Sequence, residues 1–290
     1  MKIIFLKNLL KAKPNNPHSP PSVHINVLIG SVWANRELIV QLTKREVLGR
    51  YRGSTLGIAW SFFNPIIMLV VYTFVFSIVF KTRWPVNGEE SQSQFALILF
   101  VGMLVFGFFS EVLSVAPSLI ISNANFVKKI IFPLELLSII SVGAATFHAF
   151  ISLIILLVAF VALHGYLNWT IVFIPLIFLP LAVLALGFSW LFSSLGVYLR
   201  DLKQAIGVVI TMLMFLSPLF YPVNALPAKF QFWMMINPLT FIIEQMRSVI
   251  IFGAPPNWTG ISAYLVLAII FSWASYIWFQ KVRKGFADVL

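Results

Sequence analysis

The residues with the clearest potential for chemistry are two arginines that flank a tyrosine, Arg50, Tyr51 and Arg52. Trp60 follows shortly after them, and residues 61–80 contain no charged side chain. A guanidinium donates paired hydrogen bonds to phosphate oxygens, and these bonds strengthen where the dielectric constant is low. The pattern therefore predicts a phosphate-binding site where the chain enters the membrane. The alternative is that both arginines only reach ordinary lipid headgroups.

Aromatic residues are abundant, with 29 Phe, 9 Trp and 7 Tyr. Three of them, Tyr72, Phe76 and Phe80, are spaced four residues apart and would form one stripe on a helix. Aromatic faces suit the apolar C–H faces of sugars, and tyrosine adds a hydroxyl group. We therefore interpret this stripe, together with Trp60 and Phe215, as a candidate glycan channel. Lipid-facing or interfacial aromatic residues are the alternative.

The elements that must position these side chains are membrane helices. The chain is 60% hydrophobic and 10% charged, with a mean hydropathy of +0.96, and a transmembrane helix needs about 20 apolar residues. The prediction is a single all-α integral membrane domain. Its six expected spans are residues 61–80, 95–115, 134–163, 171–199, 205–221 and 260–280.

The distribution of charge predicts the orientation. With the N-terminus inside, the inner segments hold 16 of the 20 lysines and arginines, which is the positive-inside pattern. Both termini are therefore expected in the cytoplasm, and the net charge of +11 is explained by topology rather than by nucleic-acid binding. The absence of cysteine excludes disulfides and thiolate metal sites.

Ionisable residues inside predicted spans are costly unless they are paired. Glu111 and Glu135 are expected near the inner ends of their spans, where Lys128 and Lys129 could offset their charge. We interpret His148 as a packed or hydrogen-bonded residue, because the histidines show no metal-ligand spacing. No series of acids or histidines crosses the bilayer midplane, which argues against an ion-coupled carrier.

Two short charged connections are expected on the inner side. Residues 121–132 offer helix N-caps before a short basic helix, and residues 198–204 form a second charged turn. Either could contact a cytosolic partner, although a capped turn with positive-inside lysines explains the first equally well. The candidate contact residues are Asn123, Lys128, Lys129, Arg200 and Asp201.

Repeated prolines interrupt the apolar segment from residue 217 to residue 258. Broken apolar helices persist at membrane depth only where protein or water surrounds them. We predict two short re-entrant helices, residues 227–236 and 238–252, on the outer side before the last span. They are interpreted as an outer gate, with an amphipathic surface cap as the alternative. Its candidate residues are Pro222, Trp233, Asn237, Pro238, and Glu244 paired with Arg247 at i,i+3.

No G-x-x-x-x-G-K-[ST] sequence occurs, so this chain does not hold ATP through such a loop. The sequence also lacks a nucleophile–base arrangement or paired catalytic acids. We therefore expect a transporter subunit rather than an enzyme, with no cofactor bound by this chain. Uphill transport would need a partner subunit or an ion gradient.

Several motifs in order resemble the membrane permeases of ATP-binding cassette polysaccharide exporters, which serve O-antigen, capsule and teichoic acid export. They are residues 50–60 with Asn64 and Pro65, residues 198–202, residues 217–222, and residues 237–240 leading to Glu244 and Arg247. The resemblance extends from about Trp33 to the C-terminus. Residues 1–32 would then be a variable cytoplasmic extension, and residues 33–290 the six-span exporter domain.

The resemblance implies a homodimer in the bacterial inner membrane with two copies of an ATPase subunit, which would hold ATP and Mg. The cargo implied is a lipid-diphosphate-linked glycan, with O-antigen the first expectation; teichoic acid, drug or lipid cargo, an ion-coupled carrier and a membrane scaffold are the alternatives. An interfacial amphipathic helix is expected at residues 33–49. There Trp33, Val40 and Val47 share one face, whereas Leu38, Ile39 and Leu42 fall elsewhere.

Overall fold

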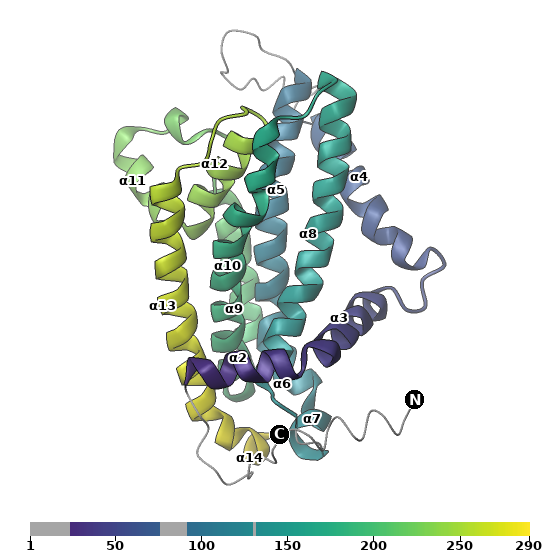
Figure 1. Ribbon diagram of the computed structural model, residues 1–290, viewed down its shortest axis with the longest axis vertical. Coiled ribbons are helices and arrows are strands. Elements are labelled where there is room, and N and C mark those ends of the chain that lie inside the picture. The colour runs from purple at the N-terminus through teal and green to yellow at the C-terminus, as the bar shows by residue number, and fades with distance from the viewer. Residues whose placement is uncertain (1–23, 76–91, 130–131) are drawn as a thin grey trace.

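The computed structural model describes residues 24–75, 92–129 and 132–290, and these residues form helices and turns without a β-strand. Long helices stand side by side in a bundle, and shorter helices cover its two ends (Figure 1). The long helices are α4 (Trp60–Tyr72), α5 (Gln92–Val115), α8 (Glu135–His164), α9 (Ile174–Tyr198) and α13 (Trp258–Val282). The all-α expectation is confirmed.

Within the described ranges, five helical stretches are long and apolar enough to cross a membrane: residues 57–75, 94–122, 135–164, 169–198 and 258–289. The expected span at 205–221 is instead α10 (Leu202–Leu216), which has 15 residues. At about 1.5 Å per residue it is about 22 Å long, shorter than the ~30 Å apolar core of a bilayer. It ends at Leu216 because Pro218 follows and the chain turns back, with Leu219 N donating to Ser217 O at 2.7 Å.

Helix α5 forms the centre of the bundle. Most of its side chains are buried, and it contacts α4, α8, α9, α10 and α12 (Pro238–Ile250). Small residues bring other helices close: a Cβ on Gly187 of α9 would lie 2.8 Å from the Cα of Ser272 on α13. Such close backbone approach is the usual basis of helix packing within membranes.

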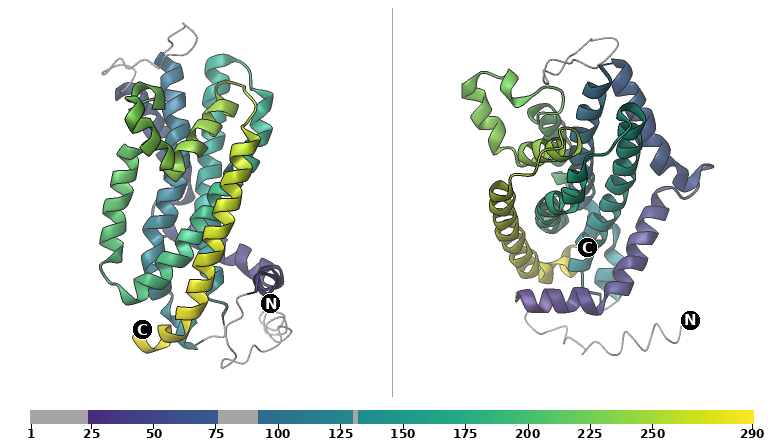
Figure 2. Two further views of the ribbon diagram at one scale, coloured as in Figure 1. Left: turned by 90° about the vertical axis from the view of Figure 1, so that its left-hand side faces the viewer. Right: turned by 45° about the horizontal axis from the view of Figure 1, so that its top comes forward.

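One end of the bundle carries α2 (Ile25–Ala34), α3 (Arg36–Arg50), α6 (Leu119–Ser122), α7 (Ala124–Lys129) and α14 (Phe286–Val289). Helix α2 lies across this end, and α3 rises from it toward α4 (Figures 1 and 2). The 3-10 turns η3 (Ala116–Ser118) and η6 (Arg283–Gly285) join elements at this end, whereas η1 (Gly57–Ala59) lies in the connection from α3 to α4.

The interfacial amphipathic helix expected at residues 33–49 stays a prediction. Trp33 and Val40 are 72% and 68% exposed, and of the face that they share with Val47 only Val47 is buried. Leu38, Ile39 and Leu42 instead pack against the buried cluster at this end. The helix breaks at Asn35, so one helical wheel does not describe both α2 and α3.

The opposite end carries η5 (Val223–Ala225), α11 (Ala228–Ile236) and α12, and η4 (Trp169–Phe173) precedes α9 (Figure 1). The two short helices expected between the prolines are present, although the second ends at Ile250 rather than residue 252. Their insertion into the membrane remains a prediction. Helix α12 buries most of one face in the core, whereas α11 buries only Met234.

Candidate functional site

A tight turn delivers the arginine–tyrosine motif to the side of the bundle. Helix α3 ends at Arg50, and α4 begins at Trp60. Between them Gly53 and Gly57 have φ angles of 87° and 53°. Glycine adopts this left-handed region without steric cost, so these two positions allow the chain to reverse direction within a few residues.

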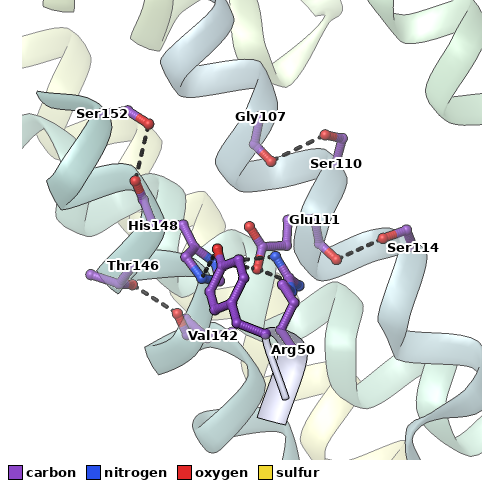
Figure 3. Close-up of polar contacts among 10 residues, drawn as sticks. Arg50, Gly107, Ser110, Glu111, Ser114, Val142, Thr146, His148 and Ser152 are labelled. Carbon is purple, nitrogen blue, oxygen red and sulfur yellow. Dashed lines mark hydrogen bonds and ion pairs between the residues drawn. The ribbon is translucent and has the colours of Figure 1, made fainter. Parts of the chain in front are cut away.

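Arg50 is held by a carboxylate and a histidine from two long helices. Its Nη2 lies 2.8 Å from Oε1 of Glu111 on α5, and the same oxygen lies 2.8 Å from Nδ1 of His148 on α8. Arg50 Nη1 is also 3.2 Å from His148 Nδ1. Figure 3 shows the three side chains meeting in the space between α5 and α8. The cluster therefore joins the N-terminal helix to the membrane bundle.

Tyr51 completes the cluster. Its hydroxyl is 3.3 Å from His148 Nε2, and the two rings meet edge to face with centroids 6.0 Å apart. Burial raises the pKa of Tyr51, so the phenol stays protonated at neutral pH and can donate or accept a hydrogen bond. The interpretation of His148 as a hydrogen-bonded residue is confirmed.

The cluster pairs opposite charges on side chains that are partly buried. The side chains of Arg50, Glu111 and His148 are 44%, 19% and 13% exposed, and an unpaired charge at such a depth would be costly. Glu111 pairs with Arg50, and Glu135 pairs with Arg283 at 3.0 Å. That Lys128 and Lys129 also offset these acids stays a prediction, because the lysine side chains lie outside the described part of the structure. Sequence reasoning missed both pairs, since neither partner is local in sequence.

A partly open cavity of about 260 Å³ lies beside the cluster. Its polar lining comes from the cluster, from α4 and from Ser152 of α8, and its apolar lining comes from α4, α5 and α8. The lining residues are Arg50, Tyr51, Trp60, Ser61, Asn64, Pro65, Met103, Leu104, Gly107, Phe108, Glu111, His148, Ala149 and Ser152. The cavity therefore presents both hydrogen-bonding groups and apolar surface, as ligand sites commonly do.

The three residues of the predicted phosphate-binding site do not share one environment in the structure. Arg50 and Tyr51 line the cavity, whereas Arg52 is exposed and is not part of the lining. Within the described part of the chain, the guanidinium of Arg52 has no carboxylate within ion-pair distance. Arg52 is thus the cation of the motif that stays available to an external anion.

Of the five predicted channel aromatics, the structure describes Trp60, Tyr72 and Phe215. Trp60 lines the cavity at the start of α4, and Phe215 is exposed on α10. Helix α4 contacts α5 and α8, whereas α10 contacts α5 and α9. Tyr72 is half-buried at the end of α4, and Phe76 and Phe80 lie outside the described residues. A channel built from these side chains stays a prediction.

At the opposite end, Arg247 of α12 is fully buried and joins three elements. Its Nε donates to Ile98 O at 3.1 Å, its Nη2 donates to Leu219 O at 3.1 Å, and its Nη1 pairs with Glu244 Oε1 at 3.0 Å. The predicted Glu244–Arg247 pair is confirmed. Arg247 therefore fixes α12 to α5 and to the turn after α10.

The other residues of the predicted outer gate have distinct positions. Asn237 caps α12 by accepting from Leu239 N at 2.9 Å, and its amide donates to Ser217 Oγ at 2.8 Å. Pro238 is the first residue of α12, Pro222 precedes η5, and Trp233 is exposed on α11. These contacts define a compact cap over α5, and a gating role remains a prediction.

The expected partner contacts lie at the end that carries α2. Asn123 does not cap the following helix through its side chain as predicted; its amide instead donates to Leu119 O at 2.9 Å, within the preceding helix α6. Arg200 and Asp201 are exposed in the turn between α9 and α10. Lys128 and Lys129 belong to α7, but their side chains lie outside the described part of the structure.

A second polar cluster at this end attaches the C-terminal segment to the bundle. Arg283 Nη1 pairs with Glu135 Oε2 at 3.0 Å and contacts Gln280 Oε1 at 3.2 Å. The indole of Trp190 donates to Glu135 O at 3.0 Å. The i,i+3 spacing of Gln280 and Arg283 is the only signal in the sequence that could have indicated part of it.

Comparison with known proteins shows which proteins this chain is similar to. A family model described as ABC-2 type transporter matches residues 37–251. An O-antigen export system permease protein, RfbA, of Myxococcus xanthus is 25% identical over 263 residues, covering 90% of this chain and 98% of the relative. A protein of the same name from Klebsiella pneumoniae is 27% identical over 257 residues, covering 88% and 95%. The polysialic acid transport protein KpsM of Escherichia coli is 19% identical over 210 residues, covering 72% and 79%.

Proposed function

Because this chain belongs to the ABC-2 type transporter family, we propose that it is the membrane permease subunit of an ATP-driven exporter. Its cargo is a lipid-diphosphate-linked polysaccharide of the O-antigen type, moved from the cytoplasmic to the outer side of the bacterial inner membrane. The similarity to O-antigen export permeases carries this proposal, since it extends over 98% of one such relative.

ATP hydrolysis is assigned to a separate subunit. The chain has no phosphate-binding G-x-x-x-x-G-K-[ST] loop, and its family supplies the transmembrane part of transporters. Two copies of the ATPase would bind ATP and Mg and contact the end of the bundle that carries α7. The basic helix α7 and the exposed turn at Arg200 and Asp201 are the contact surfaces we propose, because both stand at that end beside α14.

The permease is proposed to act as a homodimer. Helix α10 leaves an apolar stripe exposed, formed by Val208, Met212 and Phe215. A second copy could cover this stripe, and the exposed apolar residues of α4 would then face the same pathway. Trp60 and Phe215, which lie apart in one chain, would line the glycan route only in such an assembly.

Cargo enters from the inner leaflet at the arginine–tyrosine motif. The free guanidinium of Arg52 engages the diphosphate, and the exposed flank of Arg50 adds a second contact while Glu111 holds it in place. A prealigned guanidinium loses less conformational entropy on binding than a mobile one. Helix α12, fixed through Arg247, closes the outer end until the ATPase subunits drive the dimer open.

The proposal is tested in the source bacterium by removing this chain. Loss of surface polysaccharide, with lipid-linked glycan accumulating inside the cell, is the expected result. Restoring the chain should reverse both effects, and the chain without its ATPase should not. Unchanged surface polysaccharide in the deletion strain would contradict the proposed function.

Capsular polysaccharide is the second candidate cargo. It is favoured by the similarity to polysialic acid transport proteins, which covers 72% of this chain at 19% identity. The O-antigen relatives match more of the chain at higher identity. Identification of the accumulated lipid-linked glycan separates the two candidates.

A further inference from the structure

The cavity beside Arg50 has a size that fits one ring-shaped ligand. Its volume is about 260 Å³, just below the range of about 300–1,000 Å³ that is typical of small-molecule sites. One sugar ring with its hydroxyl groups is a ligand of suitable size. The cavity is partly open, so further sugars of a chain would extend outside it.

The helices that line the cavity leave open space and unused hydrogen-bonding groups facing it. Gly107 is an exposed glycine on the mostly buried helix α5, and a Cβ built there would meet no atom within 4 Å. Pro65 has no backbone N–H, so the carbonyl of Ser61 lacks its usual helical donor. Among the described residues, Asn64 has a side-chain amide without a hydrogen-bond partner. These groups are available to a ligand.

The charges favour a neutral ligand inside the cavity. One oxygen of the Glu111 carboxylate already accepts hydrogen bonds from Arg50 and His148. The negative charge of Glu111 therefore balances the positive charge of Arg50 in the cavity. A phosphate placed there would lie close to a carboxylate of the same sign, which costs energy at low dielectric. Sugar hydroxyls donate hydrogen bonds, and a carboxylate only accepts them.

We propose that this cavity is a subsite for a single neutral sugar ring, the one attached to the lipid diphosphate of the cargo. The indole of Trp60 covers the apolar face of the ring, and Asn64 and Glu111 bind its hydroxyls. Outside the cavity, Arg52 and the exposed side of Arg50 hold the diphosphate. This inference rests on the proposed function for the identity of the cargo, and it adds that the first sugar is recognised separately from the phosphates.

The test measures binding of two synthetic lipids to the permease in complex with its ATPase in lipid nanodiscs. One probe is a polyprenyl diphosphate that carries one N-acetylglucosamine, and the other is the same polyprenyl diphosphate without a sugar. Wild-type protein is expected to bind the sugar-bearing probe about tenfold more tightly, as one or two additional hydrogen bonds and the ring contact provide. Equal affinity for both probes would overturn the sugar subsite.

Two variants test whether the preference for the sugar-bearing probe arises in this cavity. Gly107→Leu places a side chain into the cavity without removing a polar group, and Trp60→Ala removes the ring contact (Figure 3 shows Gly107 above Glu111). Both are expected to abolish the preference while the affinity for the sugar-free probe stays unchanged, which also shows that the variants fold. Gly30→Leu, at an open position on α2, is the matched control and should keep the preference.

Each remaining outcome is informative. If Gly107→Leu keeps the preference, or if Trp60→Ala weakens both probes equally, the sugar does not occupy this cavity. Failure of the wild-type complex to bind either probe would count against the proposed cargo class itself. Loss of sugar-free binding in Arg52→Gln, with wild-type binding intact, would support the division between a phosphate site and a sugar site.

Discussion

The guanidinium of Arg50 lies 2.8 Å from the carboxylate of Glu111, so the end of the N-terminal helix is bonded to the most deeply buried helix of the bundle. This contact fixes the position at which the chain turns into its first membrane helix. It also determines the charge balance of the cavity next to it. An arginine at a membrane entrance is commonly a headgroup anchor; here it is part of a built polar cluster.

The first prediction concerns the strength of this pair. Arg50→Gln and Glu111→Gln should each destabilise the protein, and the double variant should lose less than their sum, with a coupling energy of about 1 kcal/mol. Thermal unfolding of the purified permease in detergent, followed for the four proteins of the cycle, measures it. Additive losses would show that the 2.8 Å contact contributes nothing to stability.

The second prediction concerns the buried Arg247. Lysine keeps the charge but cannot reach all three acceptors, so Arg247→Lys should cost about 2–4 kcal/mol of stability. Glu244→Gln should cost less, because the side chain of Glu244 is 39% exposed. Susceptibility of α11 and α12 to protease, compared between the two variants, gives the readout. Equal resistance to protease in the Arg247→Lys variant and the wild type would show that Arg247 does not fix α12.

The third prediction tests helix contact at the end that carries α7. A Cβ on Gly196 would overlap the carbonyl oxygen of Pro117. Gly196→Ala should therefore lower stability by about 1–3 kcal/mol, since α9 and η3 must separate. Gly207→Ala, at an open helical position, is the control and should be neutral or slightly stabilising. If both substitutions behave alike in thermal unfolding, the close contact is not present in the folded protein.

The fourth prediction concerns the ATPase partner. Reversing the charge of both Lys128 and Lys129 on α7 should weaken assembly with the ATPase and lower the coupled rate of ATP hydrolysis. Reversal of Lys281, an exposed cation in the last turn of α13, is the control. Co-purification and ATPase rates are the measurements. Normal assembly in the double variant would favour a purely topological role for the lysines.

The features predicted correctly from the sequence are local ones. Long apolar segments gave the long helices, prolines gave the broken segment after α10, and i,i+3 spacing gave the Glu244–Arg247 pair. Each depends on residues within a few turns of one another. The length of α10 was overestimated, because hydropathy continues past Leu216 while the backbone does not continue as a helix.

The polar cluster could not be predicted in the same way. Arg50 and His148 are separated by 98 positions, and only the packing of α3 against α8 brings them together. Sequence periodicity indicates which face of a helix is apolar, but not which helix that face meets. The same limit applies to the N-terminal segment, where the break at Asn35 means that one helical wheel does not describe both α2 and α3.

The central claim is that this chain carries lipid-linked polysaccharide across the membrane through recognition at Arg50 and Arg52. The direct measurement is ATP-dependent translocation of lipid-linked O-antigen in proteoliposomes that contain the permease and its ATPase. Wild-type protein should translocate the glycan only with both ATP and the partner. Arg50→Lys with Arg52→Lys should reduce the rate about tenfold or more at equal assembly, because lysine does not form bidentate phosphate contacts. Wild-type rates in the double variant, or translocation without ATP, would contradict the account.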